Sequence, residues 1–215
     1  MSPARNEALA SGIGNANGAL QAGRATVGAG SLKAGKQFTK ELNMTELNAN
    51  IPKEKQTVLG LYVTATEAYQ KWQADPEKVK ILDVRTPEEF LFVGHPTMAW
   101  KIPVAAQVYV WDAEKKQFPM KPLSDFVSRV SEVVKPDDTL MVMCRSGGRS
   151  AIAVNMLASA GFKNVHNIVD GMEGDVVEDP ASVFVGQRLK NGWKNSGCPW
   201  TYKLTPERMV LPRTQ

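Results

Sequence analysis

Short apolar runs alternate with stretches of helical periodicity through the middle of this chain. The runs that fit buried strands cover residues 58–63, 80–84, 99–103, 139–143 and 164–169. In residues 123–134, by contrast, the apolar side chains recur at helical spacing and form one stripe. Strands that alternate with helices predict an α/β fold, with a mostly parallel central sheet between layers of helices.

Two helix starts and one helix end carry local signals. Thr64 and Glu67 form a capping box, which predicts a helix that runs to about residue 74. Thr86 and Glu89 form a second box, and a proline stands at the first helical position between them. Gly161 is expected to end the helix that starts near residue 150, because glycine tolerates the left-handed backbone of a C-terminal cap.

A loop between the strand at residues 139–143 and the helix at residues 150–160 concentrates reactive and anion-binding residue types. It consists of Cys144, Arg145, Ser146, Gly147, Gly148, Arg149 and Ser150. Backbone N–H groups and a helix N-terminus favour a thiolate, the reactive form of cysteine. Glycine lets the loop curl inward, and arginine suits an oxyanion. A lone cysteine at a strand end is usually a buried apolar residue, but this combination predicts an anion cradle with Cys144 as its nucleophile.

Three motifs resemble those of single-domain rhodanese-like sulfurtransferases. The cysteine loop is similar to their active-site loop, and Leu-Asp-Val-Arg-Thr-Pro-Glu-Glu-Phe at residues 82–90 is similar to their other signature. The glycine turn at residues 171–174 follows the last core strand, as it does in that family. The resemblance covers about residues 58–178 and implies a rhodanese-like three-layer sandwich. The sequence departs from the family at residues 97–103, which take a longer route than the family's turn.

The resemblance implies sulfur transfer through a persulfide on Cys144. A donor such as thiosulfate, a persulfide or a polysulfide would leave its outer sulfur there, and a thiol, sulfite or cyanide would remove it. Without the resemblance, the residues indicate only an activated thiolate beside an anion site. A protein sulfur donor or acceptor is a further expected partner, whereas neither a cofactor nor a metal is expected.

The arginines of these motifs are expected to bind anions or carboxylates. Arg149 closes the loop and should bind the anionic donor. Arg145 points either into the mouth of the pocket or outward. Arg85 is expected to pair with Glu88 or Glu89, and the alternative is that it lends positive charge to the pocket.

Three other polar residues are not assigned catalytic roles. The resemblance implies that Asp83 holds loops near the site, so we interpret it as structural rather than as a general base. His95 is interpreted as a loop histidine, because a transferred sulfur needs little proton chemistry. Cys198 could resolve a persulfide as a disulfide with Cys144, but nothing in the sequence places the two together, so a free thiol is expected.

Two other functions are alternatives on the sequence. A cysteine phosphatase or arsenate reductase would use a similar cradle, but phosphatases of related architecture place five residues between cysteine and arginine and usually have histidine before the cysteine. Here four residues separate Cys144 from Arg149, and Met143 precedes the loop. The other alternative is a rhodanese-like module that carries sulfur or binds a partner without catalysis, although the intact cysteine argues against a purely structural module.

Composition changes on both sides of the central domain, which we place at residues 56–180. Residues 1–55 are rich in alanine and glycine and predict a flexible extension. Residues 181–215 contain tryptophans and other apolar side chains, so we expect a short helix at residues 182–195 and then an aromatic strap that packs on the domain. A partner-binding surface is the alternative interpretation of this strap.

Charge and composition narrow the range of partners. The net charge of +4 and the pI of about 9.0 suit small anionic substrates, while the scattered basic residues do not indicate nucleic-acid binding. Two cysteines and two histidines at these spacings predict neither a disulfide framework nor a metal site. No apolar stretch approaches the roughly 18 residues of a membrane span. No secretory signal is visible, so we expect a cytoplasmic protein, or a periplasmic one if a signal has been removed.

Overall fold

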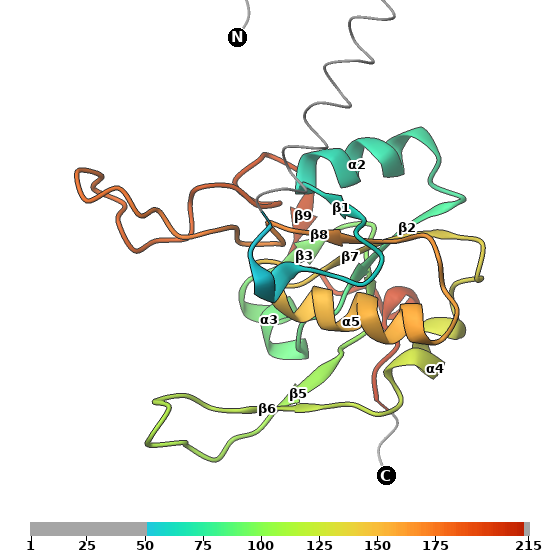
Figure 1. Cartoon of the computed structure of the whole chain (residues 1–215), viewed down its shortest axis with the longest axis horizontal. Coiled ribbons are helices and arrows are strands. Elements are labelled where there is room, and N and C mark those ends of the chain that lie inside the picture. The colour runs from blue at the N-terminus through green and yellow to red at the C-terminus, as the bar shows by residue number, and fades with distance from the viewer. Residues whose placement is uncertain (1–50, 213–215) are drawn as a thin grey trace, which may run out of the picture. The chain divides into compact units, whose positions relative to one another are not determined.

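The computed structural model describes residues 51–212, which contain a five-stranded parallel sheet (Figure 1). We predicted a flexible extension at residues 1–55, and residues 1–50 of it lie outside the described residues. The strands follow one another across the sheet in the order β1 (Tyr62–Val63), β8 (Val165–Ile168), β7 (Thr139–Met143), β2 (Val79–Asp83) and β4 (Trp100–Lys101). The register pairs Leu82 of β2 with Val142 of β7, so the strand that leads to the cysteine loop has neighbours on both sides.

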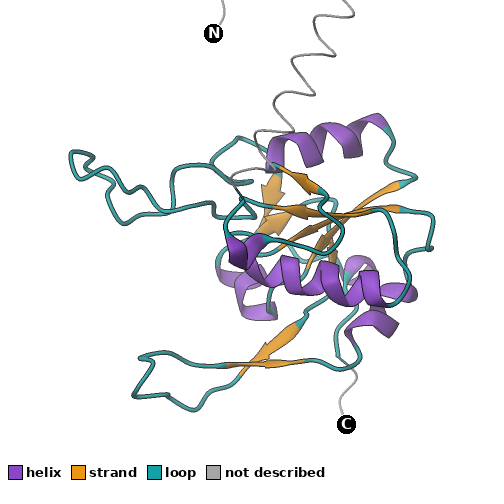
Figure 2. Ribbon diagram, in the orientation of Figure 1, coloured by secondary structure: helices purple, strands orange, loops and turns teal. Residues whose placement is uncertain are grey.

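Helices cover both faces of this sheet, which confirms the predicted sandwich (Figure 2). Side chains of β7 alternate between two hydrophobic clusters, as the pleat of a strand requires. Leu140 and Val142 pack in one cluster with α4 (Phe126–Ser131) and α5 (Gly148–Ser159). Met141 and Met143 face the other side and share a cluster with residues of α2 (Ala65–Ala74).

The helix starts match the local signals in the sequence. At the start of α2 the Thr64 N–H donates to Glu67 Oε2 at 2.8 Å, and the Glu67 N–H donates to Thr64 Oγ1 at 3.3 Å. Helix α3 (Pro87–Phe92) begins in the same way, because the Thr86 N–H donates to Glu89 Oε2 at 3.1 Å. These reciprocal bonds satisfy N–H groups that the first helical turn leaves without partners.

Two segments project from the domain and differ from the sequence-based expectations. Residues 105–122 form a hairpin of β5 (Ala105–Gln107) and β6 (Met120–Pro122), which the sequence did not predict. The expected helix at residues 182–195 is wrong, since this segment consists of turns and bends. Gly186 and Gly192 have φ angles of +83° and +98°, which interrupt a helix.

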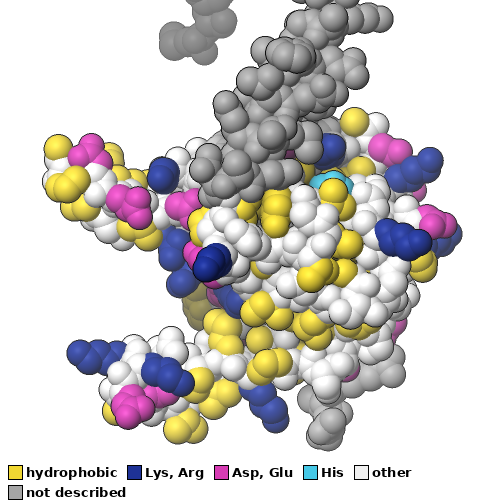
Figure 3. Space-filling model, viewed as in Figure 1, with side chains coloured by type: hydrophobic (Ala, Val, Ile, Leu, Met, Phe, Trp, Pro, Cys, Tyr) yellow, Lys and Arg dark blue, Asp and Glu magenta, His cyan; other side chains and the backbone are white. Residues whose placement is uncertain are grey.

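Exposed apolar side chains gather on these two projecting segments (Figure 3). On the hairpin they are Tyr109, Val110, Trp111, Phe118 and Met120, and on the second segment they are Val183, Phe184, Val185 and Leu189. In Figure 1 both segments extend toward the same side of the domain, the one to which the start of α5 points. Both therefore flank the end of the sheet that carries the cysteine loop.

Residues 193–210 pack on the domain as a strap. Strand β9 (Trp200–Thr201) pairs antiparallel with β3 (His95–Pro96), and the Val210 N–H donates to the Lys101 carbonyl at 3.0 Å. Between them lies the short 3₁₀ helix η2 (Pro206–Arg208). Trp193 is fully buried in the same cluster as α2, and its Nε1–H donates to the Pro199 carbonyl at 2.9 Å.

Candidate active site

Cys144 follows the last residue of β7, directly before the loop that leads into α5. Its side chain is buried, with 2% of its surface exposed. Gly147 is the N-terminal cap of α5 and has a φ of +101°, a left-handed conformation that glycine adopts without strain. A Cβ at this position would lie 2.5 Å from the Val169 carbonyl oxygen, so glycine is needed for space as well as for backbone geometry.

Two hydrogen-bond donors face the sulfur of Cys144. The Gly147 N–H donates to Sγ at 3.2 Å, and Ser150 Oγ lies 3.4 Å from the same atom. The sulfur also lies close to the N-terminus of the twelve-residue helix α5. N–H groups and the positive end of a helix both favour an anion, so this geometry suits a thiolate.

The turn at residues 171–174 forms backbone hydrogen bonds with the cysteine loop. The Met172 N–H donates to the Cys144 carbonyl at 2.8 Å, and the Glu173 N–H donates to the Arg145 carbonyl at 3.0 Å. Gly171 has a φ of +59°, and a Cβ there would lie 2.5 Å from the Cys144 carbonyl oxygen. The glycine turn seen in the sequence is therefore in direct contact with the loop.

Arg149 is paired with a carboxylate in the structure. Its Nη1 donates to Glu89 Oε2 at 2.7 Å and its Nη2 donates to Glu89 Oε1 at 2.6 Å. Burial by itself lowers the pKa of Arg149, but the bonds and the charge of Glu89, together with nearby Cys144, outweigh burial and raise it. Burial likewise raises the pKa of Glu89, and the bonds from Arg149 reverse this and lower it. Both groups are therefore charged, and Arg149 can bind an anion only in competition with Glu89.

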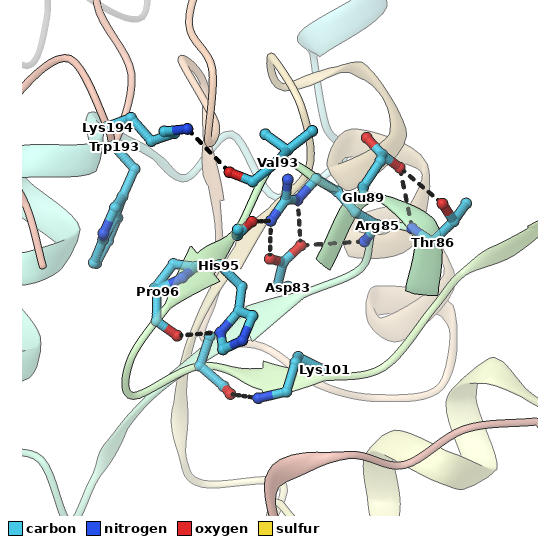
Figure 4. A network of polar contacts seen from close by, with 12 residues as sticks. Asp83, Arg85, Thr86, Glu89, Val93, His95, Pro96, Lys101, Trp193 and Lys194 are labelled. Carbon is cyan, nitrogen blue, oxygen red and sulfur yellow. Dashed lines mark hydrogen bonds and ion pairs between the residues drawn. The ribbon is translucent and has the colours of Figure 1, made fainter. Parts of the chain in front are cut away.

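Arg85 and Asp83 form a second ion pair, which is fully buried (Figure 4). Arg85 Nε donates to Asp83 Oδ1 at 2.9 Å, and Arg85 Nη2 donates to Asp83 Oδ2 at 2.6 Å. Nη2 also donates to the Gly94 carbonyl at 2.7 Å. The expected pairing of Arg85 with Glu88 or Glu89 is wrong, because its partner is two residues upstream at the end of β2.

This buried pair ties the loop after α3 to the sheet. Burial lowers the pKa of Arg85, but the charge and hydrogen bonds of Asp83 outweigh burial and raise it. The Arg85 guanidinium also lies over the Phe90 ring, 5.8 Å from its centroid. These contacts suit the structural role expected for Asp83, which stays a prediction.

The remaining candidate residues lie apart from the sulfur contacts. Arg145 is exposed to solvent. His95 is buried in β3, where its Nδ1 lies 3.1 Å from the Pro96 carbonyl, and burial lowers its pKa, which favours the neutral ring. Cys198 is a free thiol in the cluster with α2, whereas Cys144 belongs to the cluster with α5 on the opposite face of the sheet. The sheet separates the two sulfurs.

A cavity of about 910 Å³ borders the loop at Ser146 and Gly148. Its other walls include the short 3₁₀ helix η1 (Lys53–Lys55) and the base of the segment that follows the glycine turn. Lys55 and Asp175 form an ion pair of 2.6 Å across this region. Within residues 51–212 no three His, Cys, Asp or Glu side chains form a metal-binding group, and no helix is long and apolar enough to span a membrane.

Two residues of the site were not identified from the sequence. Glu89 was assigned to helix capping and to a pairing with Arg85, and its contact with Arg149 joins residues 60 positions apart. Asn167 lies in β8, fully buried, and hydrogen-bonds to both Gly147 and Ser150. Its signal in the sequence is weak, because β8 reads Val-His-Asn-Ile and nothing in that pattern distinguishes Asn167 from the neighbouring polar residue. Once it is buried, its amide must be held by hydrogen bonds.

The fold and the site together define an α/β domain in which a parallel strand ends at a buried cysteine, whose sulfur faces the Gly147 N–H at the N-terminus of α5. The model of the rhodanese-like domain matches residues 64–176, which is more than half of the chain. The chain therefore belongs to the rhodanese-like domain family.

Known proteins similar to this chain are found in bacteria and plants. The uncharacterized protein RP600 of Rickettsia prowazekii is 34% identical over 122 residues, which cover 57% of this chain and 82% of that protein. The chloroplastic thiosulfate sulfurtransferase 16 of Arabidopsis thaliana is 38% identical over 92 residues, which cover 43% of this chain and 69% of that protein. The crystal structure of Rv0390 from M. tuberculosis shares the fold, with a TM-score of 0.50 and 23% identity over 66% of this chain and 96% of that one.

Proposed function

We propose that this protein is a sulfurtransferase that moves a sulfane sulfur from thiosulfate, a persulfide or a polysulfide to a thiophilic acceptor. The observation that carries the proposal is the position of Cys144 Sγ, 3.2 Å from the Gly147 N–H at the start of α5. Membership of the rhodanese-like family supports it. So does similarity to two Arabidopsis thaliana proteins named thiosulfate sulfurtransferase 16 and 18.

The proposed reaction has two covalent steps. The Cys144 thiolate attacks the outer sulfur of thiosulfate, a new S–S bond forms, and the S–S bond of thiosulfate breaks with its electron pair leaving on sulfite. An acceptor such as cyanide then attacks the outer sulfur of the persulfide. The electron pair of that S–S bond returns to Sγ of Cys144, and thiocyanate leaves. This is ping-pong covalent catalysis, and the same N–H donor stabilises the sulfur anion before the first step and after the second.

A non-catalytic sulfur carrier is the second candidate function. The exposed apolar side chains on the two segments that flank the loop favour it, because they form the kind of surface that binds another protein. A cysteine phosphatase or arsenate reductase is less well supported, since four residues separate Cys144 from Arg149 and the arginine is already paired with Glu89.

The test is the intact mass of the protein after incubation with thiosulfate. We expect a gain of about 32 Da, one sulfur, that cyanide removes and that Cys144→Ser abolishes. Cys198→Ser is the matched control and should gain the same mass. Sulfur uptake without multiple turnovers to cyanide or a thiol would favour the carrier. No uptake from any of these donors would overturn the proposal.

A further inference from the structure

Ser150 Oγ has three acceptors within reach but only one proton to donate. It lies 2.6 Å from Asn167 Oδ1, 3.1 Å from the Gly147 carbonyl and 3.4 Å from Cys144 Sγ. The shortest of these contacts, the one to Asn167, has the geometry of a strong O–H···O bond. Ser150 and Asn167 are both fully buried, so the protein groups around them decide where this proton points.

The orientation of the Asn167 amide follows from its other two contacts. Its Nδ2 lies 2.9 Å from the Lys55 carbonyl and 3.0 Å from the Gly147 carbonyl. A carbonyl oxygen can only accept, so the NH₂ group must face both of them. The amide oxygen of Asn167 is thereby fixed toward Ser150 and can act only as an acceptor of its hydroxyl proton.

The charge on the sulfur then decides which acceptor is better. While Cys144 is a thiol, its S–H can donate to Ser150 Oγ, and the Ser150 O–H can donate to Asn167. When Cys144 is a thiolate, Sγ is a charged acceptor, and hydrogen bonds to charged groups are stronger than those to neutral ones. The Ser150 O–H can change acceptor by rotation about the Cβ–Oγ bond alone, because all the heavy atoms are already in place.

We propose that Asn167 is a positioning residue that competes with the Cys144 sulfur for the hydroxyl proton of Ser150. Asn167 holds this proton while the sulfur is a thiol or a persulfide. The hydroxyl turns to Sγ when the thiolate forms and when the acceptor removes the outer sulfur, which returns an electron pair to Sγ. No proton leaves Ser150 in either step. The proposal rests on the proposed sulfur transfer at Cys144, but its prediction for the thiolate can be measured without any sulfur donor.

The experiment is a double-mutant cycle read by the pH profile of Cys144 alkylation with iodoacetamide, in a Cys198→Ser background. Ser150→Ala removes a donor from the thiolate, so the midpoint of the profile should rise by roughly one pH unit. Asn167→Ala removes the competing acceptor but also an anchor of Gly147. The loss of this anchor is common to both backgrounds and cancels in the cycle. Asn167→Ala is therefore made in two backgrounds, one with Ser150 and one with Ser150→Ala. The change in midpoint that it causes should be more negative in the background that keeps Ser150.

Zero coupling between the two substitutions would overturn the proposal. If Asn167→Ala fails to fold in thermal unfolding, Ser150→Ala decides alone, and an unchanged midpoint would overturn it. Ser159→Ala is the control, because this serine lies in the same helix and its hydroxyl donates to the Asn155 carbonyl at 3.0 Å instead of facing the sulfur. Its profile should equal that of the parent. A protein that accepts no sulfur but shows the coupling would contradict the proposed function and the sulfur-transfer part of this inference, and would leave the competition for the thiolate supported.

Discussion

Arg149 and Glu89 are joined by two parallel hydrogen bonds of 2.7 and 2.6 Å, which connect the start of α5 to α3. About a fifth of each side chain is exposed, so the pair lies at the surface of the site rather than beneath it. The positive charge that the sequence offers to a substrate anion is thus already balanced by a carboxylate. Glu89 therefore has two functions, because it also caps α3 through Thr86.

Glu89→Gln should increase the affinity for thiosulfate while it lowers stability. Glutamine can still close the capping box, but it no longer neutralises Arg149. We expect the KM for thiosulfate to fall by roughly three- to tenfold, because Arg149 becomes available to the anion. The free energy of unfolding should fall by about 1–2 kcal/mol with the loss of a bidentate charged pair. Steady-state kinetics and denaturant unfolding measure the two effects.

Glu67→Gln separates the capping box from the ion pair. Glu67 occupies the same capping position in α2, where it bonds to Thr64. Its substitution should leave the KM for thiosulfate unchanged. An unchanged KM in Glu89→Gln as well would show that Arg149 is not a binding group for the donor.

Asp83→Asn should be among the most destabilising single substitutions in the domain. Both side chains of the Asp83–Arg85 pair have 0% exposure, so the variant leaves a buried guanidinium without its counter-ion. Breaking such a pair costs about 3–5 kcal/mol. Chemical denaturation would measure the loss. Asp112→Asn is the control, because its partner Lys115 is largely exposed and the expected change is within about 0.5 kcal/mol.

Gly171→Ala should damage activity through the shape of the cysteine loop. The added methyl group would lie 2.5 Å from the Cys144 carbonyl, so either the turn or the loop must move. We expect kcat/KM to fall by roughly 10- to 100-fold, as displacement of a reacting group does in other enzymes. Gly60→Ala is the matched control, since its φ of +62° is almost the same as the +59° of Gly171 and its Cβ would meet nothing within 4 Å. It should lose about 1–2 kcal/mol of stability but keep its activity, and equal losses of activity in both variants would contradict the contact argument.

His166 should make the protein less stable in mild acid. Burial and then the charge of Lys71 lower its pKa from 6.5 to about 4. The unfolded chain therefore binds a proton between pH 6.5 and pH 4 that the folded protein does not bind, and stability falls as the pH decreases through this window. Because the ring is partly exposed, we expect a contribution of about 1–2 kcal/mol. His166→Gln should unfold with a shallower pH dependence between pH 7 and pH 4.5, and an identical slope in both proteins would refute the assignment.

The sequence predicted the parts of this fold that depend on local signals. Thr64 and Thr86 start their helices where the capping boxes placed them, and the apolar run at residues 139–143 is a buried strand that leads to Cys144. Each of these signals lies within a few neighbouring residues, where spacing and propensity decide the structure. The position of the cysteine loop follows from the same local rules, because a strand and a helix bracket it.

The features that the sequence did not predict depend on contacts between distant residues or on backbone conformation. Arg149 with Glu89 and Asn167 with Gly147 each join different elements, and nothing in their local spacing indicates which partner is chosen. The expected helix at residues 182–195 failed for a local reason. Glycines such as Gly192 take positive φ angles there, and their frequency should have reduced its predicted helicity.

The strap at residues 193–210 has a consequence for the order in which the chain folds during synthesis. The family match ends at residue 176, yet β9 is the partner of β3 and Trp193 fills the cluster beneath α2. The ribosome makes the sheet strands and the cysteine loop before it makes residues 193–210. A nascent chain that has reached only residue 178 would therefore expose the apolar side chains that Trp193 contacts, and β3 would lack its partner strand. The domain can complete its folding only after residues 193–210 have been synthesised.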